Sequence, residues 1–365
     1  MVAGLTSLNE KICRSAVEQC IARKELPAVL QEVESCAKES CKSFLDRLCE
    51  GAVKGRDADS FTSVSEWVKN LSFSSVLLTK EDYLRAALHA LSLAPRIAAT
   101  DYGTSRQRDL AQVWTDAIRG FLGEIAFIKW LKTRFGMEAE LDFRKGQLEE
   151  FLPSDITKIA VSGEPWRKPK LRISIKTTKL QGMWLDIPYA QLEHSDIFVL
   201  VRVGVSRSHF IAFLKEISVI RDKIFRMAKE LGMHFEEDEL WSAVPDFTDI
   251  PAFVVGFFDK SEHPNIERDR TAVLIADGRI SPSRKGTVKL SLNKFMGWWN
   301  PSNPACKQRV ADALRKRGVS IPEDLNKFEV ELEGIGTPSE TLHFFVSSGI
   351  LKCGEESWRS ILTRL

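Results

Sequence analysis

The chain of 365 residues lacks any apolar run that approaches the roughly 20 residues a membrane helix needs. Its first ten residues, Met1–Glu10, lack the basic start and apolar centre of a secretory signal. Hydrophobic residues make up 44% of the chain and charged residues 28%, so an ordinary globular protein with a sizeable core is expected. We therefore predict a cytoplasmic protein without a membrane span.

Several catalytic signatures are also missing. The chain has six histidines, which disfavours a zinc hydrolase, because zinc sites draw on histidine and cysteine. It contains no Gly-x-Ser-x-Gly turn, which argues against a serine hydrolase of the α/β type. It also contains no glycine-rich phosphate loop of the Walker type, which argues against an ATP-driven motor.

Cysteine is present without a metal-binding pattern. Five of the seven cysteines fall within the first 49 residues, at spacings that match neither paired Cys-x-x-Cys knuckles nor an iron–sulfur motif: Cys13, Cys20, Cys36, Cys41 and Cys49. Cys13 and Cys20 would share one helix face, so we interpret them as small core residues, with a metal cluster as the alternative. An odd number of cysteines without a secretory signal favours a reducing compartment.

The most informative feature that is present is an alternating strand that carries a lysine. Between Leu171 and Thr178, apolar residues alternate with polar ones, as in a strand with one face on a core. Ser174 and Lys176 belong to the polar face. Lys176 is therefore expected to point into a polar cleft.

Asp155 opens a second predicted strand, which runs to Val161. The turn-rich segment Ser162–Lys170 connects the two strands, so a hairpin would bring Asp155 beside Lys176. A metal-binding carboxylate next to an ammonium group suits hydrolysis of a phosphodiester. The metal neutralises the phosphate and acidifies water, while the lysine orients that water or stabilises developing charge. The alternative is an ordinary surface hairpin with a solvated lysine.

Glu124 lies in the apolar stripe of a predicted helix, Trp114–Phe135. A carboxylate in such a stripe must be paired, protonated or bound to a cation, because burying it alone is unfavourable. Gly120 and Gly123 indicate that another backbone approaches this helix closely. We interpret Glu124 as part of a cation site; the alternative is a glutamate at the helix edge that reaches solvent or an arginine.

These features together resemble a known family. Helical Glu124, a strand expected near Glu138–Phe143, Pro153-Ser-Asp155 and Ser174-Ile-Lys176 resemble the PD-(D/E)xK nuclease core, and most closely that of type II restriction endonucleases. The resemblance covers residues 105–205. It implies catalysis with Mg²⁺, for which Mn²⁺ can substitute.

The resemblance also assigns roles to the site residues. It implies that Asp155 is the principal metal ligand, that the carbonyl of Ile175 is a further ligand and that Lys176 is the catalytic lysine. Ser174 departs from the pattern, because the family has an acidic metal ligand at that position. Glu124 is the expected substitute, which gives a predicted catalytic set of Glu124, Asp155, Ser174 and Lys176.

Basic residues surround this predicted site. The net charge is only +2, so the distribution of charge, rather than its total, points to nucleic acid. Six basic residues and one acidic residue lie between Glu164 and Lys179, and such a cluster can contact phosphates or be an ordinary solvated loop. The predicted DNA contacts are Arg167, Lys168, Lys170, Arg172, Thr177, Lys179, Arg284 and Lys285.

The C-terminal part offers further candidates for DNA contact. Arg279–Lys285 reads as a basic loop, and Ala305–Arg317 reads as a short basic helix. The aromatic residues within Phe295–Trp299 could stack on bases, although core packing is the more favoured use for at least one tryptophan.

The predicted fold belongs to the α/β (α+β) class, with a restriction-endonuclease-like mixed sheet flanked by helices. We expect a helical region over residues 1–100 that acts in scaffolding or dimerisation. A nuclease-like core is expected over residues 101–235, followed by a mixed or β-rich domain over residues 236–365.

Local signals predict several further element boundaries. Ser63–Glu66 and Thr79–Asp82 predict helix starts, and Pro95 predicts the end of the second of these helices. The expected strands are Asp196–Val203, Phe210–Leu214, Ala252–Phe258 and Ala272–Ala276, and a helix is expected over Leu214–Leu231.

The predicted function is metal-dependent hydrolysis of double-stranded DNA, most simply by a sequence-specific type II restriction enzyme. A homodimer is expected, because two strands need two active sites. A cognate methyltransferase would be a separate chain. Two alternatives stay open: a repair or defence nuclease that recognises DNA structure or modification, and a catalytically degenerate DNA-binding protein, which the Ser174 departure favours.

Overall fold

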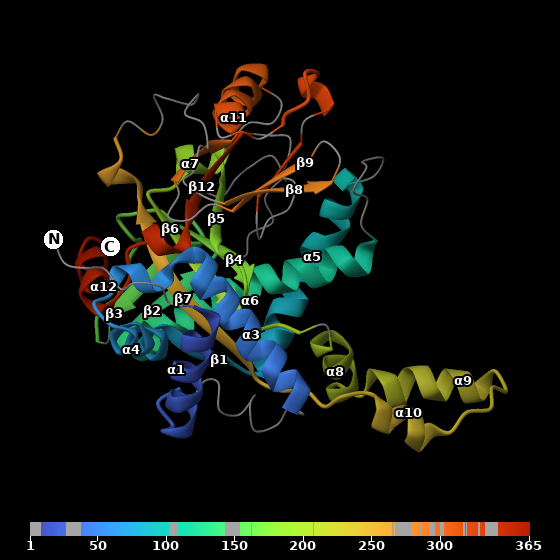
Figure 1. The fold of residues 1–365 in the computed structure, drawn as a ribbon. Helices are drawn as coiled ribbons and strands as arrows, with labels where there is room; N and C mark the ends of the chain where they lie inside the picture. The colour runs from blue at the N-terminus through green and yellow to red at the C-terminus, as the bar shows by residue number, and fades with distance from the viewer. Residues whose placement is uncertain are drawn as a thin grey trace.

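The fold is a computed structural model of mixed α/β architecture, in which helices surround several β-sheets (Figure 1). The structure describes residues 9–26, 38–101, 109–142, 154–161, 163–206, 208–264, 266, 279–284, 287–291, 296–299, 303–316, 318, 320–327, 329–332 and 342–365. Within these ranges no helix has the length and apolar character needed to cross a bilayer.

The N-terminal helices are α1 (Glu10–Ala22), α3 (Lys38–Gly55) and α4 (Val64–Ser74), with a 3₁₀ turn at Asp57–Ser60. The predicted helix start at Ser63 is confirmed, because its hydroxyl accepts the Glu66 N–H at 3.1 Å.

The described cysteine side chains of this region are core residues, as expected for Cys13 and Cys20. Cys13, Cys20 and Cys49 are free thiols buried in one apolar cluster with Trp67. Cys36 and the side chain of Cys41 lie outside the described residues.

Helix α5 (Lys80–Asp101) begins where Thr79 donates its N–H to the Asp82 carboxylate at 2.9 Å, which confirms the predicted start. The predicted end at Pro95 is wrong, because the helix continues past this proline. Pro95 is exposed. The carbonyl that loses its intrahelical partner can therefore be satisfied by water, so the helix tolerates the proline.

A four-stranded mixed sheet forms the centre of the molecule. Its strand order is β1 (Ser75–Leu78), β7 (Ile250–Asp259), β6 (Ile197–Val203) and β4 (Ile173–Lys179). Strands β4 and β6 are parallel, whereas β7 runs antiparallel to both β6 and β1. Every residue of β6 is buried, which confirms the strand predicted to have both faces covered.

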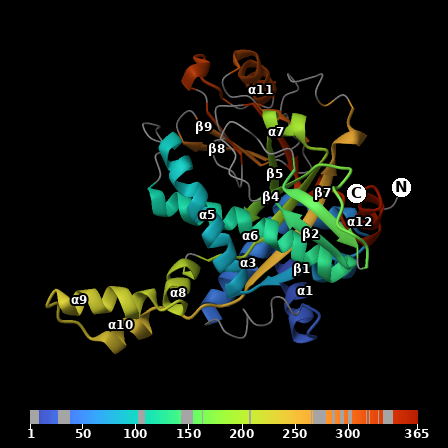
Figure 2. The same ribbon diagram turned by 180° about the vertical axis from the view of Figure 1, so that it is seen from behind.

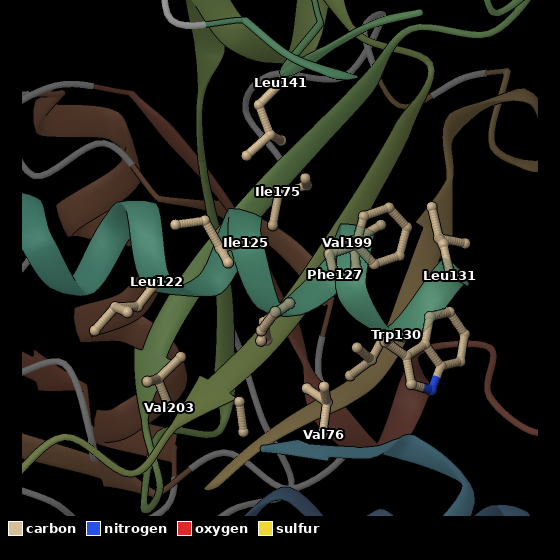
Figure 3. Packing of buried hydrophobic residues seen from close by; sticks show 14 of the residues in the cluster. Val76, Leu122, Ile125, Phe127, Trp130, Leu131, Leu141, Ile175, Val199 and Val203 are labelled. Carbon is tan, nitrogen blue, oxygen red and sulfur yellow. The ribbon is translucent and has the colours of Figure 1, made fainter. Parts of the chain in front are cut away.

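One face of this sheet is covered by α6 (Leu110–Phe135), with α5 and α12 (Glu355–Leu362) beside it. Figure 3 shows the apolar side of α6, including Leu122, Phe127 and Trp130, lying against the strands. Asp109 caps the start of α6, and Gly136 ends it at a φ of +63°. The helix predicted over Trp114–Phe135 is confirmed and begins earlier than expected.

A three-stranded antiparallel sheet covers part of the opposite face. Its strand order is β10 (Met296–Trp299), β12 (His343–Ser347) and β5 (Trp184–Pro188). Trp298 and Trp299 are each 2% exposed, and the Trp298 indole donates to the Ile266 carbonyl at 2.8 Å. Both tryptophans are therefore core residues, and the suggestion that they stack on bases is wrong for them. Phe295 lies outside the described residues.

Two smaller β-structures complete the fold. A two-stranded ribbon joins β2 (Met137–Leu141) to β3 (Ile156–Val161). A further sheet has the order β11 (Glu329–Leu332), β9 (Thr287–Ser291) and β8 (Arg279–Arg284).

The predicted basic loop at Arg279–Lys285 is therefore mostly a strand, because residues 279–284 pair with β9. Helix α11 (Pro304–Lys316) matches the predicted basic helix at Ala305–Arg317. Arg317, Lys285 and the strand predicted at Ala272–Ala276 lie outside the described residues.

An arm projects from the body of the molecule (Figures 1 and 2). It consists of α8 (His209–Glu216), a π-helix (Ile220–Phe225), α9 (Arg226–Glu230) and α10 (Glu237–Ala243). The strand predicted at Phe210–Leu214 is thus wrong. The helix predicted over Leu214–Leu231 is interrupted at Ser218, whose φ is +60°.

The central sheet draws strands from all three regions expected from the sequence. β1 comes from residues 1–100, β4 and β6 come from residues 101–235, and β7 comes from residues 236–365. One hydrogen-bonded sheet therefore connects the three regions, and the candidate site lies at its β4 edge.

Candidate active site

Three elements bring the predicted catalytic residues together. Asp155 directly precedes β3, Lys176 lies in β4 and Glu124 lies in the middle of α6. All three side chains are half-buried, so the site is open to solvent in part.

Asp155 is bound to the outer edge of β4, which is the last strand of the central sheet among the described residues. Its N–H donates to the Ile173 carbonyl at 2.7 Å, and its carboxylate accepts the Ile175 N–H at 2.5 Å. The N–H and C=O of one strand residue point to the same side. The Ile175 carbonyl therefore faces the edge on which the Asp155 carboxylate lies.

The predicted hairpin between the Asp155 strand and the Lys176 strand is only partly right. β3 pairs with β2, and β4 pairs with β6. The residues just before β3 nevertheless contact β4, which brings Asp155 to the predicted place.

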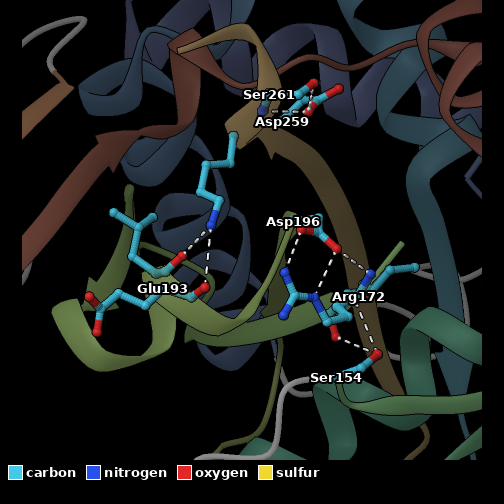
Figure 4. A network of polar contacts seen from close by, with 9 residues as sticks. Ser154, Arg172, Glu193, Asp196, Asp259 and Ser261 are labelled. Atoms are coloured by element: carbon cyan, nitrogen blue, oxygen red, sulfur yellow. Dashed lines mark hydrogen bonds and ion pairs between the residues drawn. The ribbon is translucent and has the colours of Figure 1, made fainter. Parts of the chain in front are cut away.

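A polar network fixes the start of β4 (Figure 4). The Ser154 hydroxyl accepts the Ile173 N–H at 3.1 Å. The Arg172 guanidinium binds the Asp196 carboxylate at 2.9 Å, and Asp196 also accepts the Arg172 N–H at 2.8 Å. Arg172, a predicted DNA contact, is thus engaged within the protein, and Asp196 acts at the strand end rather than as a metal ligand.

Burial raises the pKa of Glu124 well above its ordinary value, and the nearby Asp155 carboxylate raises it further. Lys176 opposes this effect, whereas Asp142 adds to it. Asp142 follows β2, is buried and donates its N–H to the Asp155 carbonyl at 2.9 Å. The sequence analysis missed Asp142; its position directly after a strand beside an acid-bearing helix was the available signal.

The other two groups respond to the same surroundings. Burial raises the pKa of Asp155, and the Ile175 N–H and Lys176 oppose that shift. Burial lowers the pKa of Lys176, and Asp155, Asp186 and Glu124 oppose it. Lys176 shifts the pKa of both acids, and Asp155 shifts that of Glu124, so the three groups form one electrostatic site of the kind that functional sites favour.

Gln191, in α7 (Tyr189–His194), connects the lysine to Ser174. The Lys176 ammonium donates to the Gln191 side-chain oxygen, and the Gln191 amide donates to the Ser174 hydroxyl at 2.7 Å. Ser174 is 1% exposed and in turn hydrogen-bonds to Asp155, which opposes the rise in that residue's pKa. Ser174 therefore supports its neighbours through hydrogen bonds. Sequence reasoning missed Gln191, because a glutamine fifteen residues after the lysine matches no motif.

Thr177 lies between β4 and α6. Its hydroxyl donates to the Gly120 carbonyl at 3.0 Å, and a Cβ added to Gly123 would lie 1.8 Å from the Thr177 hydroxyl oxygen. The backbone approach predicted at Gly120 and Gly123 is wrong in its partner, because at Gly123 a side chain makes the close contact and at Gly120 an added Cβ would meet no atom within 4 Å. Thr177 is half-buried, and its hydroxyl is engaged with α6 within the protein.

The remaining predicted DNA contacts lie in different surroundings. Arg167 is exposed, but its guanidinium donates to the Leu365 carbonyl at 2.6 Å. Lys168, Lys170 and Lys179 are exposed. The side chain of Arg284 is not among those described, and Lys285 lies outside the described residues.

The site offers oxygen donors only: the carboxylates of Glu124 and Asp155 and the Ile175 carbonyl. Such donors suit a hard cation such as Mg²⁺. Burial and neighbouring carboxylates raise the pKa values of Glu124 and Asp155, so both groups would gain from a cation between them. Within the described part of the chain, no group of three or more His, Cys, Asp or Glu side chains is arranged to hold a metal. A cation held by the Glu124 and Asp155 carboxylates would have the Ile175 carbonyl as its third protein donor.

Comparison of the chain with protein-family models, curated proteins and solved structures finds no match. The functional interpretation therefore depends on the geometry and electrostatics of this site.

Proposed function

We propose that this protein is a metal-dependent endonuclease of the PD-(D/E)xK type that hydrolyses phosphodiester bonds in double-stranded DNA. A sequence-specific restriction enzyme is the simplest form of this activity. The observation that carries the proposal is that Asp155 is hydrogen-bonded to the outer edge of β4, the strand of Lys176, and that both groups shift the pKa of Glu124 on α6. The mixed central sheet flanked by helices supports a restriction-endonuclease-like fold.

The proposed roles follow from the chemistry of each group. Asp155, Glu124 and the Ile175 carbonyl would hold Mg²⁺, which supplies positive charge to the phosphate and acidifies water. The Lys176 ammonium stabilises charge that develops on the phosphate, or orients the attacking water. Its lowered pKa brings proton exchange nearer to neutral pH, where a general acid or base is most effective.

DNA would approach over the exposed basic side chains near this edge. Among the predicted contacts, Lys168, Lys170 and Lys179 are exposed; Arg167 and Arg172 are exposed too, but their guanidinium groups are bound within the protein. Contacts between lysines and phosphates release counterions, so binding should weaken as salt increases. These phosphate contacts do not depend on the base sequence. Contacts with the edges of the bases would provide sequence recognition.

A second candidate, a catalytically degenerate DNA-binding protein, is favoured by one observation. Ser174 stands where the family has an acid, and its hydroxyl accepts from the neutral amide of Gln191 and hydrogen-bonds to Asp155. Calorimetric titration with Mg²⁺ or Mn²⁺ separates the two candidates, because a site that has lost its metal function should bind neither ion.

The test of the proposed activity uses purified full-length protein, plasmid or phage DNA and Mg²⁺. We expect cleavage by the native chain and a loss of at least about 100-fold in rate for Asp155→Asn and for Lys176→Met, because each removes a group that acts on the reacting phosphate. DNA binding should persist in both variants. Asp116→Asn, on α6, and Lys158→Met, on β3, make the same chemical changes at exposed or half-buried ion pairs and should cleave normally.

Unchanged cleavage in both site variants would remove this site assignment. Substrate form then distinguishes the nuclease classes. Discrete fragments from unmodified plasmid favour a restriction enzyme, whereas cleavage confined to branched or methylated DNA favours a repair or defence nuclease.

A further inference from the structure

Trp166, in the segment between β3 and β4, is the only exposed aromatic side chain among the described residues. It is 49% exposed, whereas the other tryptophans are buried or half-buried. Within the described part of the chain, its indole makes no hydrogen bond and no contact with another ring. A single exposed apolar side chain is common on protein surfaces, so the surroundings of this ring decide whether it has a partner.

The segment that carries Trp166 is anchored to the body of the protein directly after the ring. Arg167 exchanges backbone hydrogen bonds of 2.8 and 2.9 Å with Ile159 of β3, and its guanidinium donates to the Leu365 carbonyl at 2.6 Å. The Lys170 N–H donates to the same carbonyl at 2.9 Å. An ordered segment therefore presents the ring, so that little conformational freedom would be lost when a ligand binds.

Lys168 and Lys170 supply positive charge beside the ring. Both are exposed, and neither forms an ion pair within the part of the chain that the structure describes. Successive side chains of an extended segment point to opposite sides, so Trp166 and Lys168 lie together on the side opposite the Arg167 side chain. Glu164 is the single acid between residues 163 and 172. The segment thus combines an open aromatic face with two ammonium groups that have no counter-ion among the described residues.

An aromatic ring beside unpaired cations matches a nucleotide whose base is not stacked. The base stacks on the ring, and the cations contact the adjoining phosphates. A base inside a duplex is already stacked on both faces, so the ring could reach it only if the duplex were distorted. An anionic membrane fits less well, because binding at a membrane surface depends on a larger apolar face than one ring provides.

The segment lies within reach of a DNA strand bound at the candidate active site. Asp155 directly precedes β3, and Ile159, which pairs with Arg167, lies four residues after Asp155. Four residues of a strand span about 13 Å. This distance corresponds to roughly four nucleotides of one DNA strand. A strand with a phosphate at the metal-binding acids could therefore extend to Trp166.

We infer that Trp166 is a DNA-contact residue that stacks on an unpaired base, with Lys168 and Lys170 on the adjoining phosphates. The inference rests on the proposed function for its partner, DNA, but it concerns binding rather than cleavage. It specifies the substrate class as DNA that presents an unpaired base within a few nucleotides of the cut, as at a gap, a strand end or a flipped nucleotide.

The experiment measures binding of the full chain, with EDTA present, to labelled single-stranded, gapped and fully paired DNA by fluorescence anisotropy. We expect Trp166→Ala to weaken binding to single-stranded and gapped DNA by at least about fivefold, the loss that one stacked base produces. Binding to fully paired DNA should change by less than about twofold, because paired bases are not available to the ring. Trp166→Phe keeps a ring and should bind nearly as tightly as the native chain. Leu231→Ala, at a 77% exposed position, is the control and should bind normally.

The salt dependence of binding tests the two lysines. Lys168→Met combined with Lys170→Met should reduce the slope of log Kd against log salt concentration by about 1.4 for single-stranded DNA, at about 0.7 for each phosphate contact. Lys352→Met removes an ammonium group that is paired with Glu262, so it should leave the slope unchanged.

Equal affinity of Trp166→Ala and the native chain for single-stranded DNA overturns the inference, as does a native chain that binds no DNA. A loss of the same size on fully paired DNA also overturns it, because the ring would then not recognise an unpaired base. Association with anionic phospholipid vesicles that depends on Trp166 and is stronger than DNA binding would identify a membrane as the partner instead.

Cleavage measured with Mg²⁺ separates this inference from the proposed function. Cleavage by a chain whose DNA binding does not depend on Trp166 refutes the inference alone. Binding that depends on Trp166, in a chain that does not cleave, refutes the nuclease activity alone.

Discussion

At the scale of single residues, the acids of the candidate site are expected to serve function while lowering the stability of the folded protein at neutral pH. The Glu124 pKa lies above its ordinary value of 4.5, because burial and Asp155 disfavour the ionised carboxylate. The folded chain therefore binds this proton more tightly than the unfolded chain does. Stability from this group is fully present below the ordinary pKa and is lost as pH rises through the raised one.

This direction of the pH dependence of stability predicts the effect of Glu124→Gln in metal-free protein. The substitution removes a carboxylate whose charge is unfavourable at neutral pH, so the melting temperature at pH 8 should rise by about 2–4 °C, the shift that roughly 1 kcal/mol produces in a large domain. The gain should shrink as pH falls below the raised pKa, and cleavage should be lost. Thermal unfolding at several pH values provides the measurement, and an equal gain at every pH would contradict the account.

Gln191 is predicted to position Lys176, since its side-chain oxygen accepts from the lysine ammonium. Gln191→Ala should lower kcat by about 10–100-fold, as is usual for groups that orient a catalytic residue. It should also move the alkaline limb of the pH–rate profile to lower pH, because the charged lysine loses an acceptor. Gln191→Glu should move that limb to higher pH, because a carboxylate favours the ammonium form.

The control for Gln191 lies in the same helix. Glu193 in α7 is exposed, so Glu193→Gln should leave the pH profile unchanged. If Gln191→Ala and Gln191→Glu moved the alkaline limb of the profile in the same direction, Gln191 would have a packing role only.

At the scale of elements, the position of Glu124 depends on how closely α6 approaches β4. Gly123 permits this approach, since an added Cβ would lie 1.8 Å from the Thr177 hydroxyl oxygen and 2.8 Å from its Cβ. Gly120, one turn earlier, has no atom within 4 Å of an added Cβ. The two glycines therefore form a matched pair on one helix.

We predict opposite effects of alanine at these two positions. Gly123→Ala should destabilise the protein by about 1–3 kcal/mol, because overpacking moves α6 away from the sheet, and should reduce metal affinity with it. Gly120→Ala should stabilise the protein by up to about 1 kcal/mol, through helix propensity. Urea denaturation measures both, and similar changes in the two variants would exclude close packing as the reason for Gly123.

Elements with a strong internal period could be predicted from the sequence. The apolar stripe of α6, the alternation in β4 and the unbroken apolar run of β6 each carry their own signal. Phe210–Leu214 has the same local appearance as a short buried strand, yet it forms part of α8, because a run of this length does not distinguish the two structures. Arg279–Arg284 became a strand through pairing with β9, which its own residues do not indicate.

The residues of the candidate site likewise include some that the sequence indicates and some that it does not. Glu124, Asp155 and Lys176 could be chosen in advance because ionisable groups in an apolar stripe or before and within strands are conspicuous. Gln191 could not, since its role depends on which strands and helices meet, and Asp142 had only its position after a predicted strand as a signal. The partner strand of β3 likewise follows from tertiary packing rather than from the turn after it.

At the scale of the whole molecule, one buried ion pair joins segments from distant parts of the chain. Arg202 of β6 is 2% exposed, and its guanidinium binds Asp57 at 2.5 Å. It also donates to the carbonyls of Gly51 and Gly182 and to the Ser348 hydroxyl. The N-terminal helices, the central sheet and the C-terminal segment therefore share one hydrogen-bonded centre.

This connection predicts that the described regions unfold together. Arg202→Met should destabilise the protein by about 3–5 kcal/mol, because it leaves the buried Asp57 charge without its partner. The double variant Arg202→Met with Asp57→Leu should recover much of that loss, since both charges are then removed. Lys158→Met, which breaks an exposed pair of 3.0 Å with Glu140, should change stability by less than about 1 kcal/mol.

Urea denaturation followed by tryptophan fluorescence and by circular dichroism tests this prediction, because the two probes report different parts of the chain. Coincident transitions at a lower midpoint in Arg202→Met are expected if β6 couples the N-terminal helices to the sheet. Separate transitions in the native protein would show that the N-terminal helices fold independently. In that case the pair between Arg202 and Asp57 would connect two units that unfold separately. The destabilisation caused by breaking the pair would then be confined to the less stable unit.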